Sequence, residues 1–547
     1  MVGGLKNRVK FLLALIVLTG ALHGVAKAQS LEEMKAELKA LQKRIEQLEA
    51  AQRRHPAERA APVAQRGPSA AETRAAQQAA EQARAAAAQA QQAAIQAQQE
   101  AAEAKKKAAA EVKAAYAPPP GKPGLSFRIP GTETTVRPYG FVKLNGSTDL
   151  TTQDRNDALT AQSIQLLNTP AQQIGGDTQF SARRSRIGIE TWTPVNQTFG
   201  EFHTLIEMDF AGQNTSLTTQ SASSSYTPRL RKAYADFGQP TGGWGAFLFG
   251  QNDTLFSDAA LLPIQWLSDW TFVGMDNVRQ AQLRYTYGLA NGISLAFGVE
   301  SPYSDITTSA GTSFPDSNGG DGFGWQRSPD FTGRVLYKRD WGQLALRGVV
   351  RPQIDLNNNG ASSVPAQFNR SVTGYGIGVT AVVNLLDGRL VLMGSGNAGN
   401  GLGRYLDATA NGFGAVSNAG LPGTTAADTS LNTVGVYGGM LGAQYFFTPT
   451  LRTNMAIGGA RLMMPSYTAQ FGGCVGAASS SGTCSTVNTS EWAGSINLIW
   501  SPFKMIDLGF EYQHVERALQ QRAVTGTNAS AGGGIENRLQ VTTIGRF

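Results

Sequence analysis

The last ten residues of this chain, Arg538-Leu539-Gln540-Val541-Thr542-Thr543-Ile544-Gly545-Arg546-Phe547, are the stretch that decides how its fold is interpreted. Apolar or small residues occupy every second position and end on Phe547, while the positions between them are mainly polar. A two-residue period is typical of a strand with one apolar and one polar face. Soluble proteins also end on half-buried strands, so the remaining sequence has to separate these alternatives.

The first 28 residues have the three parts of an export signal. A basic start containing Lys6, Arg8 and Lys10 precedes a short apolar core at 11–18, and Ala26-Lys27-Ala28 forms a small-x-small cleavage pattern. The apolar core is shorter than the roughly 18–20 residues that a membrane-spanning helix needs. We therefore expect 1–28 to be a signal peptide, and together with the last strand this favours an outer-membrane β-barrel.

Composition is consistent with a barrel and gives little information about charge. The chain has 63 Gly and 41% hydrophobic residues, and a barrel wall needs apolar residues only at every second position. The net charge of +7 arises within the first 120 residues, because residues 121–547 contain 29 basic and 29 acidic side chains. The net charge therefore predicts no nucleic-acid partner, and selectivity has to be argued from local charge placement.

The region before the barrel is predicted to be mainly helical. Leu31, Met34, Leu38, Leu41, Ile45 and Leu48 are spaced 3, 4, 3, 4, 3, which favours an oligomerising coiled coil over an amphipathic helix packed on a domain. The segment at 70–115 consists mainly of Ala, Gln, Glu and Lys, which favour helix. The predicted divisions are a coiled coil at 29–50, a linker at 51–69, an Ala-rich helix at 70–115 and a Pro/Gly linker at 116–136.

Residues 137–547 consist of alternating segments whose connections are strictly short and long in turn. The short connections contain Pro, Gly or Asn, as tight turns require. This pattern predicts an all-β fold, a transmembrane antiparallel β-barrel of about 16 strands with both ends on the periplasmic side. The predicted strands are 137–149, 180–192, 200–211, 229–238, 245–251, 278–288, 292–300, 330–340, 342–355, 371–386, 389–398, 433–447, 451–464, 488–501, 504–517 and 534–547.

Several segments resemble the DcaP-like trimeric outer-membrane porins. They are Tyr139-Gly140-Phe141-Val142-Lys143-Leu144, Phe180-Ser181-Ala182-Arg183-Arg184-Ser185-Arg186-Ile187-Gly188, Gly200-Glu201 with Ile206-Glu207-Met208-Asp209-Phe210, Leu230-Arg231-Lys232-Ala233-Tyr234 and Val278-Arg279-Gln280-Ala281-Gln282-Leu283-Arg284-Tyr285. The resemblance covers 137–300 well and the remainder by architecture, including the leading coiled coil. It implies a homotrimer of 16-stranded barrels that passes small, often anionic solutes such as dicarboxylates. The Ala-rich segment at 70–115 departs from the family.

Strand parity assigns charged side chains to the lumen. On the first strands a turn centred between Asn196 and Gln197 would set Arg186 opposite Glu207 and Arg184 opposite Asp209. These pairs either stabilise the wall or shape the electric field of a water-filled pore. Later arginines have no equal set of lumen-parity acids and form a ladder that could pass carboxylates between successive sites. The pore-lining candidates are Arg184, Arg186, His203, Glu207, Asp209, Arg284, Arg334, Arg347 and Arg351.

Two connections stand out among the predicted loops. The one at 253–277 is apolar and aromatic, so we expect it either to fold into the barrel as a constriction or to cover a trimer interface. Its constriction candidates are Trp266, Asp269 and Trp270. Cys474 and Cys484 are separated by nine residues in a Gly/Ser-rich loop of an exported chain, which favours one loop-closing disulfide over free thiols.

The predicted function is that of a porin: passive uptake of small hydrophilic solutes, with a preference for anions such as dicarboxylates. We expect a homotrimer in outer-membrane lipid, inserted by the barrel-assembly machinery through the strand ending at Phe547, with the N-terminal helices in the periplasm. No enzyme activity, cofactor or metal is predicted, because His55, His203 and His514 show no metal-ligand spacing and no partner Ser stands out. The alternative is a structural protein that tethers envelope layers and uses the barrel as an anchor.

Overall fold

A computed structural model describes most of the residues from 70 onward. The described residues are 70–115, 125–152, 158–159, 164–165, 167, 175–212, 226–241, 243–268, 273–275, 278–308, 313–314, 324–325, 327–358, 368–406, 414–419, 421, 423–468, 488–525 and 529–547. The predicted signal peptide, coiled coil and first linker, the pair Cys474 and Cys484, and the loop residues Asp269 and Trp270 lie outside them.

The helix α2 (Ala70–Ala115) spans the 46 residues for which an Ala-rich helix is expected. Its residues are strong helix formers, and the side chain of Ile95 is exposed. Among the described residues, no helix combines the length and the apolar character needed to cross a membrane.

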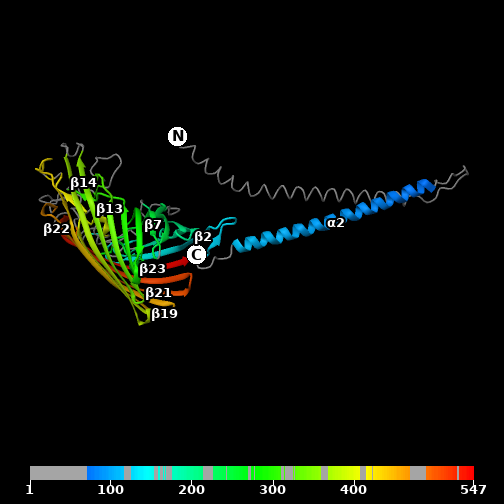
Figure 1. Ribbon diagram of the computed structural model, residues 1–547. Coiled ribbons are helices and arrows are strands. Elements are labelled where there is room, and N and C mark those ends of the chain that lie inside the picture. Colours follow the sequence, from blue (N-terminus) through cyan, green and yellow to red (C-terminus); the bar gives the residue numbers. More distant parts are fainter. Residues whose placement is uncertain are drawn as a thin grey trace, which may run out of the picture. The chain divides into compact units, whose positions relative to one another are not determined.

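Within the described residues, sixteen antiparallel strands form one closed barrel, as predicted (Figure 1). Each strand pairs with its neighbour along the chain, and β2 pairs with β23 to close the ring. The strands are β2 (Thr135–Asp149), β4 (Arg186–Asn196), β5 (Gly200–Asp209), β6 (Arg229–Gln239), β7 (Gly245–Asp253), β8 (Arg279–Gly288), β9 (Ile293–Glu300), β13 (Asp330–Arg339), β14 (Gly342–Asn358), β15 (Phe368–Leu385), β16 (Leu390–Asn400), β19 (Gly435–Thr448), β20 (Leu451–Met463), β21 (Asn488–Phe503), β22 (Ile506–Thr525) and β23 (Ala529–Arg546).

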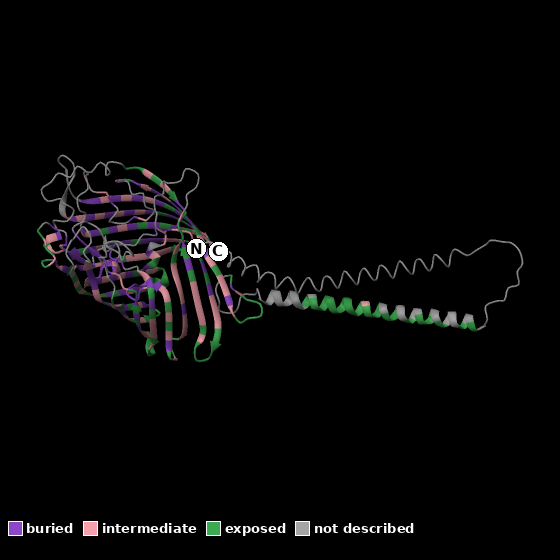
Figure 2. Ribbon diagram, turned by 90° about the horizontal axis from the view of Figure 1, so that it is seen from above, coloured by how far each residue is buried: buried purple, intermediate pink, exposed green. Residues whose placement is uncertain are grey.

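Alternation along the strands separates an outer from an inner surface, as the buried and exposed stripes of Figure 2 show. On β23 Val541 is exposed, whereas Arg538, Gln540 and Thr542 are buried within the barrel. Phe547 is also exposed, and its backbone N–H donates to Gly140 O at 3.1 Å, which ties the end of the chain to β2. The parity predicted for the last ten residues is therefore confirmed.

Short connections form the tight turns that the sequence predicts. At Asn291 and Gly292 the φ angles are +64° and +75°. Asn and Gly tolerate this left-handed conformation, which a two-residue hairpin requires. These turns include the short 3-10 helices η3 (Ala290–Gly292) and η4 (Leu386–Gly388).

One predicted strand is interrupted. The segment predicted at 180–192 forms β3 (Asp177–Ser181) and β4, separated by a break at 182–185. Both parts pair with β2, β3 with its second half and β4 with its first. Arg184 lies in this break rather than on a regular strand.

Short strands and inward loops complete the described structure. A hairpin strand β1 (Phe127–Arg128) pairs with β2, and β12 (Gly324–Trp325) pairs with β14. A second sheet of the described residues contains β10 (Ile306–Thr307), β11 (Ser313–Phe314), β17 (Ala415–Ser417) and β18 (Leu431–Thr433), and η5 (Gly403–Tyr405) precedes β17.

The main hydrophobic cluster lies inside the barrel. Inward apolar residues of the wall from β14 to β22, among them Val382, Met393 and Met440, pack against loop residues such as Phe256 and Ile264. Loops therefore cover one side of the interior.

Candidate pore and its constriction loop

The described part of the connection between β7 and β8 (254–268 and 273–275), here called the constriction loop, packs against inward side chains of the barrel wall. That it narrows the pore stays a prediction. The loop contains the 3-10 helix η2 (Ala259–Gln265), which begins with the Asp258 side chain accepting a hydrogen bond from the Ala260 N–H. This helix packs against β19 and β20. The side chain of Ile264 approaches Gly442, where a Cβ atom would leave only 2.1 Å to Ile264 Cδ1. Glycine at this position lets the loop approach the wall.

Polar contacts hold the far side of this constriction loop. Trp266 Nε1 donates to Asp507 Oδ2 at 2.7 Å, and Lys143 Nζ donates to the Trp266 carbonyl at 3.2 Å. Gln540 Nε2 donates to the Leu267 carbonyl at 3.0 Å. Because these partners belong to β22, β2 and β23, the loop reaches the strands on both sides of the barrel closure.

The beginning of the loop is held by Arg347. Its guanidinium donates to the Phe256 carbonyl and to Ser395 Oγ, the latter at 3.0 Å, and it lies over the Phe256 ring at 5.4 Å. The residue is 1% exposed. The structure therefore places Arg347 beneath the loop, away from water.

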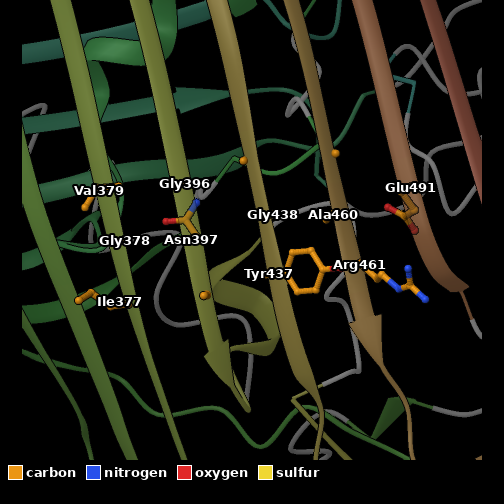
Figure 3. A pocket seen from close by; sticks show the side chains of 13 residues that line it. Ile377, Gly378, Val379, Gly396, Asn397, Tyr437, Gly438, Ala460, Arg461 and Glu491 are labelled. Carbon is orange, nitrogen blue, oxygen red and sulfur yellow. The ribbon is translucent and has the colours of Figure 1, made fainter.

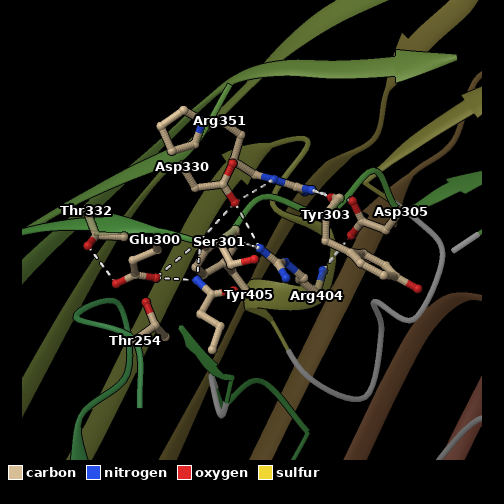
Figure 4. A network of polar contacts seen from close by, with 12 residues as sticks. Thr254, Glu300, Ser301, Tyr303, Asp305, Asp330, Thr332, Arg351, Arg404 and Tyr405 are labelled. Atoms are coloured by element: carbon tan, nitrogen blue, oxygen red, sulfur yellow. Dashed lines mark hydrogen bonds and ion pairs between the residues drawn. The ribbon is translucent and has the colours of Figure 1, made fainter. Parts of the chain in front are cut away.

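A buried network around Glu300 joins the same part of the loop to β9, β13 and η5 (Figure 4). Glu300 Oε1 accepts from the Leu255 N–H at 3.0 Å and from Thr332 Oγ1 at 2.7 Å. Tyr405 Oη donates to Asp330 Oδ2 at 2.9 Å. Burial raises the pKa of the Tyr405 hydroxyl well above its usual value, so this hydroxyl remains a donor.

Arg351 joins the network to the loops beyond β9 and β16. Its guanidinium lies 2.5 Å from Asp305 Oδ1 and 3.6 Å from Asp330 Oδ2, and it donates to the Gly401 carbonyl at 2.6 Å. Like Arg347, Arg351 is 1% exposed. Asp305 of a loop and Asp330 at the start of β13 thus neutralise Arg351.

The register between β4 and β5 differs from the prediction by two residues. Arg186 lies opposite Asp209, and Gly188 lies opposite Glu207. The turn is centred at Thr198 rather than between Asn196 and Gln197, since Asn196 pairs with Gly200, and a bulge between Pro194 and Asn196 shifts the pairing back by one residue. Arg186 nevertheless lies 3.3 Å from Glu207 diagonally across the strands. The predicted placement of Arg186 directly opposite Glu207 is therefore wrong, although the two charges interact.

A second bulge lies on β6. The register shifts between Glu207 and Met208, so the partner strand gains one residue around Arg231. Arg231 contacts Asp209 at 2.7 Å, and the next residue, Lys232, contacts Asp253 at 2.6 Å. Two consecutive basic residues can therefore both form ion pairs.

His203 lies between two acids on neighbouring strands. Its ring nitrogens are 2.8 Å from Glu190 Oε1 and 2.7 Å from Asp236 Oδ2. Trp192 stacks on the imidazole, with ring centroids 5.5 Å apart. Glu190 also accepts from Arg137, which continues the row of ion pairs onto β2.

Arg284 and Arg334 are less enclosed than Arg347. Arg284 Nε donates to Gln282 Oε1 at 3.0 Å, and Arg334 lies 3.7 Å from Asp258 of the constriction loop. Asp258 keeps two other partners, the Ala260 N–H and Gln343 Nε2. Arg334 and Arg347 are register partners on β13 and β14, yet they differ in their contact with water.

Burial is unequal within most of these ion pairs. Arg186 is 23% exposed against 8% for Glu207, Arg229 is 34% exposed against 1% for Asp209, and Arg334 is 20% exposed against 3% for Asp258. The pair of His203 with Asp236 has the opposite order. In the first three pairs the carboxylate lies against the wall, and the guanidinium covers it and faces the barrel interior.

The sequence did not identify several residues of this arrangement. Asp258 and Asp305 lie in long connections and Glu300 ends β9, and none of the three was among the predicted pore-lining residues. The apolar character of both faces of β15, β16 and β19 was a usable signal, because an inward apolar face has to be covered. Among the described residues, no group of three or more His, Cys, Asp or Glu side chains is arranged to hold a metal.

A closed barrel of sixteen described strands with an inward-folded loop has the architecture of an outer-membrane channel. A family model described as the porin subfamily matches residues 125–517. The chain therefore belongs to the porin subfamily and is an outer-membrane channel protein.

Several solved structures match this chain at low sequence identity, and the first of them shows the same fold. The outer membrane channel DcaP of Acinetobacter baumannii has a TM-score of 0.54 and 20% identity, covering 76% of this chain and 97% of that one. OprB of Pseudomonas putida has a TM-score of 0.44 and 9% identity, covering 75% and 94%. OmpT of Vibrio cholerae has 0.42 and 10%, covering 77% and 99%. A comparison with curated proteins gives no match.

Proposed function

We propose that this porin is a passive channel that favours small anionic solutes, dicarboxylates among them. The observation that carries the proposal is the unequal burial of the inner ion pairs, in which guanidinium groups lie above their carboxylates. Although basic and acidic side chains are balanced in number over the barrel, the nearer charge for a solute in the interior is positive. A positive potential in a narrow aqueous path raises the local concentration of anions.

The proposed path follows the charged side of the interior. Loop residues cover the apolar inner face from β14 to β22, whereas the ion pairs line β2, β4, β5 and β6. Guanidinium groups bind carboxylates bidentately, and several of them along a path exchange a dicarboxylate from one to the next. Arg186, Arg229, Arg231, Arg284 and Arg334 are the residues to which we assign this role. Arg347 and Arg351 hold the loops.

We also propose that the barrel forms a homotrimer, as the resemblance implies, with the N-terminal helices in the periplasm. The solved structure of DcaP supports the barrel fold of each subunit. An envelope tether anchored by a closed barrel remains the competing function. It predicts negligible conductance, whereas the channel predicts ion currents through each copy.

The test is the ion preference of the variant Arg284→Gln/Arg334→Gln in a planar bilayer. These two arginines are suitable because Arg284 contacts Gln282 and a backbone carbonyl, and Asp258 retains other partners without Arg334. We expect the reversal potential in a salt gradient to shift toward cation preference. The shift should shrink at high salt, because the Debye length falls from about 10 Å at 0.1 M to about 3 Å at 1 M.

The matched control is Arg339→Gln, which removes an exposed arginine that stacks on Tyr337 at a short turn. It should leave the reversal potential unchanged. Liposome swelling should show that the double variant slows dicarboxylate entry more than entry of a neutral sugar. Unchanged ion preference in a double variant that still assembles normally would refute the anion preference and leave a general diffusion pore.

A further inference from the structure

The outer wall has an apolar hollow of about 630 Å³ across β15, β16, β19 and β20 (Figure 3). Register pairing aligns Gly396, Gly439 and Gly459 on three adjacent strands, with Val379 at one end and Trp492 at the other. The row lies on the outward face, since Val379 and Trp492 are both exposed. The hollow exists because three neighbouring outward positions have no side chain.

One edge of the hollow carries a polar pair. Tyr437 and Arg461 are register partners on β19 and β20, one outward position beyond the glycine row (Figure 3). Arg461 lies near the end of β20 that leads into a long connection, which is the extracellular end of an outer-membrane barrel. Its side chain is exposed and makes no ion pair or hydrogen bond with the residues that the structure describes.

An outward arginine in a membrane wall requires an anionic partner or water. Leu441 and Ile457 border the hollow on its other side, toward the middle of the membrane. From the extracellular side inward, the wall therefore presents Arg461, then the glycine row, then the apolar side chains of Leu441 and Ile457. This order matches a lipid of the outer leaflet, with its phosphate at the surface and its acyl chains below.

We propose that this hollow binds a phosphorylated lipid of the outer leaflet, with the phosphate on Arg461 and an acyl chain over the glycine row. The guanidinium group binds phosphate bidentately, and an acyl chain covers the glycine row. Asn397 and Glu491 also line the hollow, but both are buried and each accepts a hydrogen bond within the wall. The site is separate from the channel, because it faces outward while the ion pairs face inward.

A second copy of the chain is the competing occupant, and the charges of the wall argue against it. A neighbouring barrel would have to supply an acid for Arg461 at this level. On the described strands of this wall, Glu516 is the outward acid aligned with Trp492 and the glycine row. It already accepts from Trp492 Nε1 at 2.7 Å and lies 3.2 Å from His514.

The test is native mass spectrometry of the full-length protein in detergent, titrated with diphosphoryl lipid A. We expect Arg461→Gln to weaken binding at least about tenfold, because it removes a charge-assisted hydrogen bond. Gly396→Leu should abolish binding by filling the floor. A Cβ atom at 396 meets nothing closer than 3.8 Å, so this side chain points into the hollow without a clash in the wall.

Two matched variants control for general effects. Gly333→Leu fills a second outward hollow of about 640 Å³ whose described lining residues carry no charge, and its Cβ has 3.9 Å of clearance. Arg339→Gln removes an exposed arginine at the opposite end of the strands. Both should bind the lipid as the wild type does.

Four outcomes would overturn the proposal. Wild-type binding by both Arg461→Gln and Gly396→Leu would show that the lipid lies elsewhere. Equal binding of lipid A from which the phosphates have been removed would show that Arg461 recognises no phosphate. A change of oligomeric state in Gly396→Leu would assign the hollow to a second copy. Competition by millimolar inorganic phosphate alone would identify a free-anion site rather than a lipid site.

Discussion

Replacing Arg347 should loosen the constriction loop without changing ion preference. Its guanidinium donates to the Phe256 carbonyl, to Ser395 Oγ at 3.0 Å and to Asn397 Oδ1 at 3.2 Å, so it connects the loop to β16. In Arg347→Met the aliphatic stem is kept while these bonds are lost. The Phe256 carbonyl then remains buried without this donor.

The magnitude follows from the number of bonds that reach the loop. A hydrogen bond to a charged group contributes about 1.5–3 kcal/mol, and the variant also avoids burying a charge, which offsets part of the loss. One of these bonds reaches the loop, so a net loss of about 1.5 kcal/mol in docking of the loop start is expected, which corresponds to roughly a tenfold increase in its undocked population. Trp266 and Leu267 remain anchored to β22 and β23, so the loop end should stay in place.

Single-channel recording measures this effect as current noise and brief changes of conductance. We expect Arg347→Met to raise both, with the reversal potential of the wild type, while Arg334→Gln shifts the reversal potential with quiet currents. The two residues are register partners, so position along the pore is matched. The reasoning fails if Arg347→Met gives quiet currents and shifts ion preference as much as Arg334→Gln, because Arg347 would then act as a charge in the path.

Two further predictions concern assembly. Phe547→Ala should lower the amount of folded barrel in the membrane more than it changes conductance, since Phe547 is the exposed end of the closing strand; normal levels in a fractionation assay would contradict an assembly signal. Deletion of 29–120 should leave trimers on non-denaturing gels, because we attribute the assembly to the barrel wall. Monomers alone would assign it to the N-terminal helices.

The strand pattern could be predicted from sequence because every barrel strand repeats one local rule. All sixteen predicted segments coincide with barrel strands, and the turn at Asn291 and Gly292 has the backbone that its residues favour. The register between neighbouring strands was harder to predict from the sequence. The turn lies at Thr198 rather than between Asn196 and Gln197, so Arg186 pairs with Asp209 instead of Glu207 despite the one-residue bulge between Pro194 and Asn196.

Contacts of the inward loops could not be derived from strand parity. Arg347 and Arg351 have the same lumen parity as Arg334, yet loop residues cover them. Parity gives the side of the wall on which a residue lies, whereas exposure depends on what packs over it. The apolar sequence of 253–277 indicated that it would be buried, but its partners on β22 and β23 are distant in sequence.

Small residues allow the same part of the wall to accept a loop on its inner face and to form a hollow on its outer face. Inward Gly442 admits Ile264 of the constriction loop, and outward Gly396 contributes to the outer hollow. Neighbouring strand residues point to opposite faces, so each face can be changed with little effect on the other. A large residue at 442 should therefore displace the loop and alter conduction, whereas a large residue at 396 should alter only what the outer wall binds. If the substitution at 442 changes only conduction and the one at 396 changes only binding to the outer wall, the two faces act independently. Loose packing of the wall would instead make each substitution affect both properties.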